Sequence, residues 1–189
     1  MAKTQKKTLV KKKKKWYTIL APKEMNQVII GETPASDISL LQGRVVKANL
    51  MNLTNDMKKQ SMVASFKVKS VKESTAETEF TGYVIMPSHV KRLVKRSKDK
   101  VGDSFKCETK DGKKIVIKPL LLIKNKLQRN VLSSLRMTAR DVLTKEAKNK
   151  TFSELASAIF NKDIQKTTKQ ALKKVYPVTM VEIRALELA

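Results

Sequence analysis

A short helical pattern that runs directly into a β-hairpin pattern, over residues 87–123, is the feature that most constrains the fold of this chain. Pro87 suits the first turn of a helix, where a missing backbone N–H costs no hydrogen bond. The apolar residues that follow recur at helical spacing, with lysines and arginines between them. Asp111-Gly112 indicates a tight turn between two strands, because both central residues of a type I′ turn need a positive φ. The sequence therefore predicts a helix with a basic outer face beside a sheet.

Strand patterns before this segment extend the predicted sheet. Residues 16–20, 43–53, 61–71 and 78–86 are rich in β-branched and aromatic residues or alternate between apolar and polar residues. Gly82 lies in the middle of the last of these and indicates a bulge or a close backbone approach. Short polar turns between the segments favour antiparallel pairing. With the hairpin, about five or six strands are expected, which is enough to curl into a barrel-like sheet.

After residue 123 the patterns become helical and then return to a strand. Apolar residues recur at intervals of three and four from about 124 to 149. Thr151 and Glu154 form a capping box that begins a second helix, and a third is expected from about 162 to 175. Residues 178–188 alternate as a last strand. A strand of this kind is not stable alone, so we expect it to return to the sheet.

The predicted fold class is α+β, with an antiparallel β-barrel-like core, a basic helix, C-terminal helices and a final strand that returns to the sheet. We expect residues 1–15 to be a disordered basic arm, because a block of like charges repels itself. The rest, residues 16–189, is expected to be a single α+β unit. It is predicted to be β-rich over 16–123 and helical over 124–176, with the last strand over 178–188.

The formal net charge of +24 predicts a polyanionic partner, because a folded domain with such an excess repels itself at low salt. Nucleic acid is the leading candidate. An anionic membrane surface usually calls for an amphipathic helix with large apolar residues or for lipidation, and no lipidation motif is present. A protein that is basic only for solubility is the remaining interpretation.

Basic residues in several segments are the candidate phosphate contacts. Each segment alone could be a solvated face, and the N-terminal run could be a solubility tail or an import-like signal; together they favour an RNA or DNA backbone. No motif for base readout is present, so contact by shape and backbone is expected. The candidates are Lys11, Lys12, Lys13, Lys14 and Lys15 in the arm, Arg44, then Lys91, Arg92, Lys95 and Arg96, and finally Arg129, Arg136 and Arg140.

Trp16 follows the basic run directly and has two interpretations. An exposed tryptophan can stack on a base. A tryptophan can also be the largest anchor of a core. Because the chain has one Trp and few other aromatic residues, the sequence favours the core anchor, with base stacking as the alternative.

Catalytic and metal-binding chemistry has little support in the sequence. One Cys and one His exclude a disulfide within the chain and a Cys/His zinc site, and they fit a reducing compartment. His89 is interpreted as a solvated or helix-end residue and Cys107 as a small strand residue. No phosphate-cradling glycine loop, clustered acids or membrane-length apolar run is present. We therefore expect no enzyme activity, no cofactor and no membrane partner.

Several short motifs occur in order and at consistent spacing along the chain. They are Lys15-Trp16-Tyr17 with Ala21-Pro22, Ile30-Gly31-Glu32-Thr33, Leu41-Gln42-Gly43-Arg44, the basic stretch His89 to Arg96, Asp111-Gly112, Asp163-Ile164, Val175-Tyr176-Pro177 and Val181-Glu182-Ile183-Arg184. Together these motifs resemble the archaeal and eukaryotic small-subunit ribosomal protein family S-three-A-e (eS-one). The resemblance runs from about Lys15 to Leu188 and is to the compact archaeal form, which ends soon after the last strand.

The resemblance implies a structural constituent of the small ribosomal subunit that supports translation in the cytoplasm. It implies binding to small-subunit rRNA on the platform, near the 3′ end of that rRNA and the mRNA exit. Neighbouring small-subunit proteins, and mRNA near the exit, are the further partners it implies.

Two other classes of protein stay open on the residues alone. A chromatin-type protein would associate with DNA, and its association would be sensitive to DNase rather than RNase. An RNA-processing enzyme would need a catalytic cluster that the sequence does not show.

Overall fold

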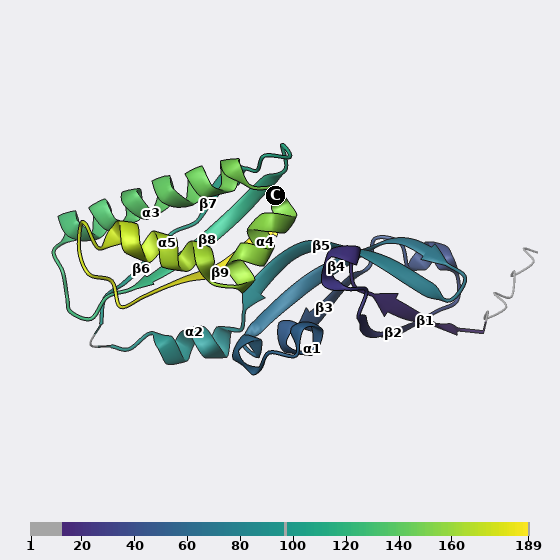
Figure 1. Ribbon diagram of the computed structural model, residues 1–189. Helices are drawn as coiled ribbons and strands as arrows, with labels where there is room; N and C mark the ends of the chain where they lie inside the picture. The colour runs from purple at the N-terminus through teal and green to yellow at the C-terminus, as the bar shows by residue number, and fades with distance from the viewer. Residues whose placement is uncertain (1–12, 97, 189) are drawn as a thin grey trace, which may run out of the picture. The chain divides into compact units, whose positions relative to one another are not determined.

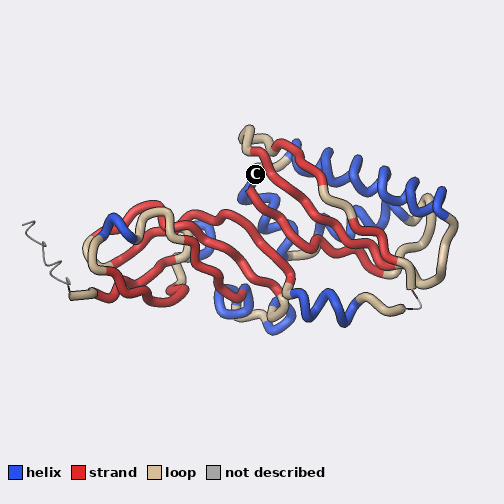
Figure 2. The backbone as a smooth tube through the Cα atoms, turned by 180° about the vertical axis from the view of Figure 1, so that it is seen from behind, coloured by secondary structure: helices blue, strands red, loops and turns tan. Residues whose placement is uncertain are grey.

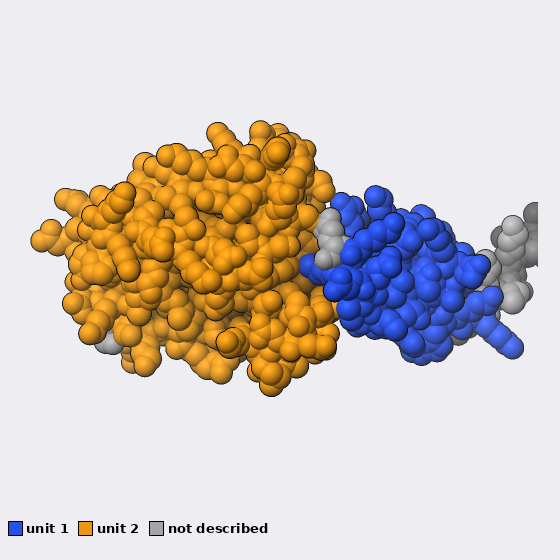
Figure 3. All heavy atoms as spheres, in the orientation of Figure 1, with its two compact units in different colours: residues 1–45, 67–79 blue, residues 46–66, 80–189 orange. Residues whose placement is uncertain are grey.

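The computed structural model describes residues 13–96 and 98–188, which divide into two compact units (Figures 1 and 3). The first unit comprises residues 13–45 and 67–79 of the described chain, and the second comprises residues 46–66 and 80–188. Strands β4 (Met62–Lys72) and β5 (Thr75–Ile85) contribute residues to both units. That residues 16–189 fold as a single unit stays a prediction.

The two units contain different helices and strands. The first unit holds β1 (Lys15–Leu20) and β2 (Ile29–Ala35), with short 3₁₀ turns at Lys23–Met25 and Ile38–Leu40. β3 (Val45–Asn49) lies at the junction of the two ranges. The second unit holds α1 (Leu50–Thr54), a 3₁₀ turn at Met57–Lys59, α2 (Pro87–Leu93), β6 (Lys100–Gly102), β7 (Phe105–Glu108), β8 (Lys114–Leu122), α3 (Arg129–Asn149), α4 (Phe152–Phe160), α5 (Asp163–Leu172) and β9 (Met180–Leu188).

The α+β class is confirmed, but the sheet is not closed into a barrel. The described strands pair in the order β2-β1-β5-β9-β8-β6, with β3 attached to β4, β4 to β5 and β7 to β8. β1 joins β5 in parallel rather than antiparallel, through Thr18–Leu20 and Thr75–Glu77. β2, at the end of the order, runs through Pro34, which cannot donate a ladder hydrogen bond and is tolerated on an edge strand. The prediction of an antiparallel barrel-like core is therefore wrong in closure and in one pairing.

The last strand returns to the sheet, as predicted. β9 lies between β5 and β8, and its pairing with β8 extends from Ile115 opposite Leu188 to Leu122 opposite Met180. Figures 1 and 2 show α3, α4 and α5 over one face of these strands. The core beneath the helices combines residues in, or close to, β6, β8, α3, α5 and β9: Val101, Leu121, Ile123, Leu135, Ala139, Leu172, Val178 and Val181.

Aromatic rings join the second unit's strands to α4. Phe80 packs against Phe66, Phe152 and Phe160, with ring centroids 6.0, 5.3 and 5.8 Å apart. Tyr83 packs edge-on to Phe160 at 5.7 Å, and its buried hydroxyl donates to the Ile183 carbonyl at 2.8 Å. Burial, and secondarily the charge of Glu182, raise the pKa of Tyr83, so the hydroxyl stays protonated and keeps this hydrogen bond.

The predicted hairpin exists, but its turn is longer than a type I′ turn. β7 pairs antiparallel with β8, and the last pair is Glu108 opposite Lys114. Five residues, 109–113, connect them, with hydrogen bonds from Thr109 N to Lys113 O and from Gly112 N to Thr109 O. Only Gly112 of the Asp111-Gly112 pair has a positive φ, +72°. Asp111 instead accepts a hydrogen bond from the Phe152 N–H at 3.2 Å, a contact across the fold that the dipeptide alone does not reveal.

The starts of α1 and α4 coincide with side-chain caps, whereas α3 begins without one. The capping box at Thr151 and Glu154 is present, and the hydrogen bond from the Thr151 N–H holds the pKa of the Glu154 carboxyl below its usual value. α3 begins at Arg129, five residues after the predicted start at 124. The predicted strand 43–53 ends at Asn49, because the Asn49 side chain accepts from Met51 N and caps α1.

Gly82 marks a close approach of two strands, and we expect alanine there to destabilise the protein. A Cβ at this position would lie 2.7 Å from the Leu186 carbonyl oxygen, which is backbone and cannot move aside. Gly82→Ala should lower the free energy of unfolding by about 1–3 kcal/mol, measured by urea denaturation. Gly102→Ala is the matched control: no atom lies within 4 Å of the added Cβ, so its unfolding free energy should stay within about 0.5 kcal/mol of the wild type. Equal stability of the two variants would contradict the close approach.

Candidate nucleic-acid interface

The basic residues predicted on α2 are exposed, as the sequence pattern predicts. Pro87 occupies the first turn, and Val90, Leu93 and Val94 are half-buried. Four cations lie exposed on and just after the helix: Lys91, Arg92, Lys95 and Arg96. Within the described residues none of the four forms an ion pair with a carboxylate, so their charge is available to an external anion.

The three predicted arginines of α3 divide into two kinds. Arg129 and Arg136 lie two helical turns apart and are exposed, and no ion pair is formed by either within the described chain. Arg140 pairs with Asp103 at 3.1 Å, and its guanidinium lies 5.3 Å from the centre of the Phe105 ring. Arg140 therefore joins α3 to the loop before β7, and its charge is largely satisfied inside the fold.

The predicted residues of the first unit lie at and near β1. Lys13, Lys14 and Lys15 are exposed, whereas Lys11 and Lys12 lie outside the described residues. Arg44 is half-buried and donates a hydrogen bond to the Thr33 hydroxyl. This contact holds the guanidinium against β2.

Trp16 is 65% exposed, so the core-anchor interpretation is wrong. Side chains alternate across a strand, and β1 directs Tyr17 and Ile19 into the core. Trp16 is consequently placed on the outer face, in register with Pro34 of the neighbouring edge strand. A large exposed aromatic side chain beside three exposed lysines is the arrangement that base stacking requires.

A groove of about 600 Å³ in the second unit brings together cations that are far apart in the sequence. Its lining includes Arg136 of α3, Lys100 of β6 and Arg184 of β9, beside Val90 and Val94 of α2. Of these cations, the sequence patterns indicated Arg136 but neither Lys100 nor Arg184. The signal for Arg184 was present: it is a single cation inside a strand whose neighbours are otherwise mostly apolar.

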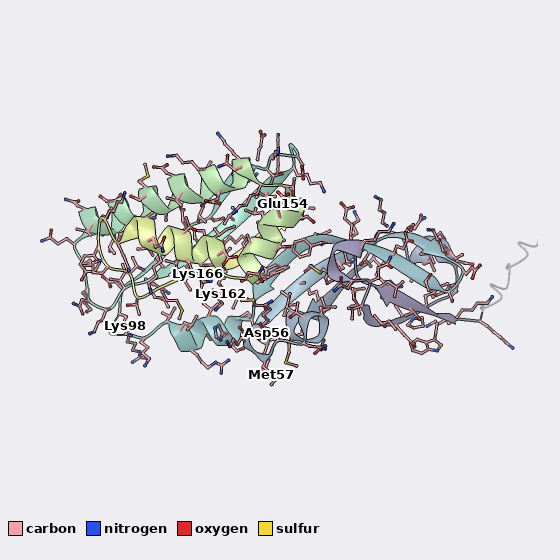
Figure 4. The ribbon with its side chains drawn as sticks, viewed as in Figure 1. Asp56, Met57, Lys98, Glu154, Lys162 and Lys166 are labelled. Atoms are coloured by element: carbon pink, nitrogen blue, oxygen red, sulfur yellow. The ribbon has the colours of Figure 1, made fainter. Side chains whose placement is uncertain are left out.

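A second groove, of about 490 Å³, lies on the other side of α2. Arg92 and His89 line it together with Lys58 and Met57. Met57 is 72% exposed and projects from the 3₁₀ turn after α1, as Figure 4 shows. His89 is half-buried near the start of α2, as the helix-end interpretation expects.

Burial and ion pairing account for two potentially reactive side chains of the second unit, Cys107 and Glu182. Burial raises the pKa of the Cys107 thiol to about 11, so little thiolate forms near neutral pH. The buried carboxylate of Glu182 is paired with Lys162 at 3.1 Å, and this pair links the start of α5 to β9. Among residues 13–96 and 98–188, no group of three or more His, Cys, Asp or Glu side chains is placed to hold a metal ion.

None of the described helices is both long enough and apolar enough to span a bilayer. The longest, α3, carries exposed arginines along its length. What the described surface offers is a set of unpaired cations on α2 and α3, with further exposed lysines and a tryptophan at β1. The sequence analysis predicts phosphate contact for cations of this kind.

Comparison with known proteins places the chain in a family. The model of the ribosomal S3Ae family matches residues 2–189. The small ribosomal subunit protein eS1 of Nanoarchaeum equitans is 33% identical over 177 residues, which cover 94% of this chain and 89% of that protein. The protein of the same name from Methanothermobacter thermautotrophicus is 34% identical over 172 residues, 91% and 88% of the two chains. For the protein from Saccharolobus islandicus the identity is 31%, over 91% and 83%.

These matches confirm the family resemblance inferred from the motifs. A family of structural ribosomal proteins also agrees with the prediction that the chain is not an enzyme. By the extent of the family match and by these identities, the chain belongs to the ribosomal S3Ae family.

Proposed function

We propose that this chain is a structural constituent of the small ribosomal subunit and that it binds rRNA mainly through the cations of α2 and α3. The observation that carries the proposal is the unpaired state of Lys91, Arg92, Lys95, Arg96 and Arg136 within the described residues, in a member of a ribosomal-protein family. Such a protein acts on the ribosome in the cytoplasm and supports translation.

The proposed location is the platform, near the 3′ end of the rRNA and the mRNA exit. Neighbouring small-subunit proteins are its further partners, and mRNA near the exit is another. The family resemblance supports this location, and the charge of +24 supports a partner that is itself highly charged.

Association with the small subunit is the first test. In sucrose gradients, the chain should sediment with small subunits at low salt and leave them at high salt, because each phosphate contact releases a counterion. RNase should release the chain and DNase should not, which separates the rRNA proposal from a chromatin-type function. Free protein at the top of a low-salt gradient would contradict the proposal.

The basic residues of α2 should determine part of the salt dependence of RNA binding. Lys91→Ala/Arg96→Ala removes two exposed, unpaired cations, so the slope of log K against log[salt] should fall by roughly 0.7–0.9 for each phosphate that the variant no longer neutralises. Binding to rRNA fragments by fluorescence anisotropy at several salt concentrations measures the slope. Lys173→Ala/Lys174→Ala removes the same charge from two exposed lysines at the end of α5, and this control should leave the slope nearly unchanged. A double α2 variant with the wild-type slope would remove α2 from the interface.

Trp16 should report RNA binding directly, because it is the only tryptophan in the chain. We expect single-stranded RNA to quench its fluorescence by stacking, and an abasic ribose-phosphate polymer to bind without quenching. Trp16→Ala should weaken RNA binding by about 1–3 kcal/mol. Ile29→Ala, which removes another exposed apolar side chain of the first unit, should not. RNA binding without quenching would show that Trp16 does not stack on a base.

A further inference from the structure

We propose that the groove beside α2 holds one nucleotide of a single-stranded RNA segment, with its phosphate bound by Arg184, Arg136 and Lys100. The inference rests on the proposed RNA-binding function and names a specific site within it. It adds Arg184 of β9 and Lys100 of β6 to the contacts predicted from the sequence patterns.

The backbone around Arg184 is irregular in a way that releases its side chain from the sheet. In the β8–β9 ladder Lys118 lies opposite Ala185, while Pro119 lies opposite Ile183. Arg184 is thus the extra residue of a β-bulge and has no partner in β8. Pro119 explains the bulge, because proline cannot donate a ladder hydrogen bond and is rarely accepted in an internal strand, and β8 is internal.

The other neighbour of β9 also ends beside Arg184. Pairing between β5 and β9 ends at Val84 opposite Ala185, and the chain then leaves the sheet and enters α2. Arg184 therefore lies at an interruption of the ladder on both sides. It is exposed although Ile183 and Ala185 beside it are 1% and 3% exposed. Bulges commonly direct a side chain to a functional position, and this one directs Arg184 into the groove.

The charges in the groove are unbalanced in favour of an anion. Arg184, Arg136 and Lys100 are exposed and form no ion pair within the described residues. Asp103 is the one carboxylate in the described lining, and it is already paired with Arg140 at 3.1 Å. Two guanidinium groups and an ammonium group thus face the same space, and guanidinium matches phosphate oxygens through paired N–H donors.

The remaining lining suits the uncharged part of a nucleotide. Val90, Val94, Pro119 and Leu120 give the groove an apolar wall beside the cations. Its volume of about 600 Å³ is in the range of small-ligand sites, so it accommodates one unstacked nucleotide and not a duplex. A nucleotide carries a phosphate next to the apolar face of a base, which matches a lining of cations beside an apolar wall. An acidic peptide presents carboxylates without that face.

Binding of the full-length chain to single-stranded oligouridylate, measured by fluorescence anisotropy, tests the site. Arg184→Gln and Arg136→Gln should each weaken binding on the order of tenfold, because each removes charged hydrogen bonds to one phosphate. The control Lys173→Gln removes one exposed cation outside the groove lining and should change binding by less than about threefold. Urea denaturation of each variant checks that the fold is intact.

Two further variants distinguish a defined phosphate site from general electrostatic attraction between the basic surface and RNA. Arg184→Lys keeps the charge but loses the paired donors, so it should still weaken binding severalfold; a field alone predicts wild-type affinity. Arg184→Gln/Arg136→Gln should lose less than the product of the two single effects, because both arginines share one phosphate. Wild-type affinity of Arg184→Lys together with strictly multiplicative losses would overturn the site.

The outcomes also distinguish this inference from the proposed function. If the wild-type chain binds oligouridylate but Arg184→Gln behaves like Lys173→Gln, the groove is not a nucleotide site while RNA binding stands. If the wild-type chain does not bind oligouridylate or rRNA at low salt, the RNA-binding function itself fails. If Arg184→Gln weakens the binding of polyglutamate and leaves that of oligouridylate unchanged, the groove accepts an acidic protein segment instead, and the nucleotide assignment is overturned.

Discussion

The pairing of β9 with β5 and β8 is the contact on which the second unit depends. It joins residues 82–84 and 115–122 to residues 180–188, and α3, α4 and α5 lie between β8 and β9 in the sequence. Once β9 is in place, Tyr83 donates across the strand to Ile183, and Lys162 of the α4–α5 turn reaches Glu182. Sequence-distant pairings of this kind cost loop entropy before they yield contacts, so the aromatic and apolar packing beneath the helices must offset that cost.

The same pairing explains how a structural strand also exposes a cation. Pro119 in β8 breaks the ladder, β9 bulges, and Arg184 emerges between two buried neighbours. Along β9, the irregular position is flanked by Ile183 and Ala185, which are buried and pair with β8. A strand holds a side chain in a more fixed position than a surface loop does, which suits recognition of a single phosphate group.

Charge is the second constraint on this chain. With 41 Lys and Arg against 17 Asp and Glu, the acids are too few to neutralise the cations. The fold uses several acids where they hold elements together, as Asp103 does with Arg140 and Glu187 with Lys118. Among residues 13–96 and 98–188, the exposed cations of α2 and α3 form no ion pair, which is consistent with a ribosomal protein whose compensating charge belongs to RNA.

The sequence by itself determined the features that depend on residues close together in the chain or on its total composition. The 3.6-residue and two-residue periods located most of the longer helices and strands, Thr151 and Glu154 located a helix start, and the net charge predicted a polyanionic partner. The tertiary structure decided which face of β1 carries Trp16, that Arg140 is paired with Asp103, and that Arg184 lies in a groove with Arg136 and Lys100. It also decided that the sheet stays open. The physical reason is distance along the chain: periodicity, capping and charge are local or additive, whereas strand neighbours, bulges and ion pairs depend on residues that only folding brings together.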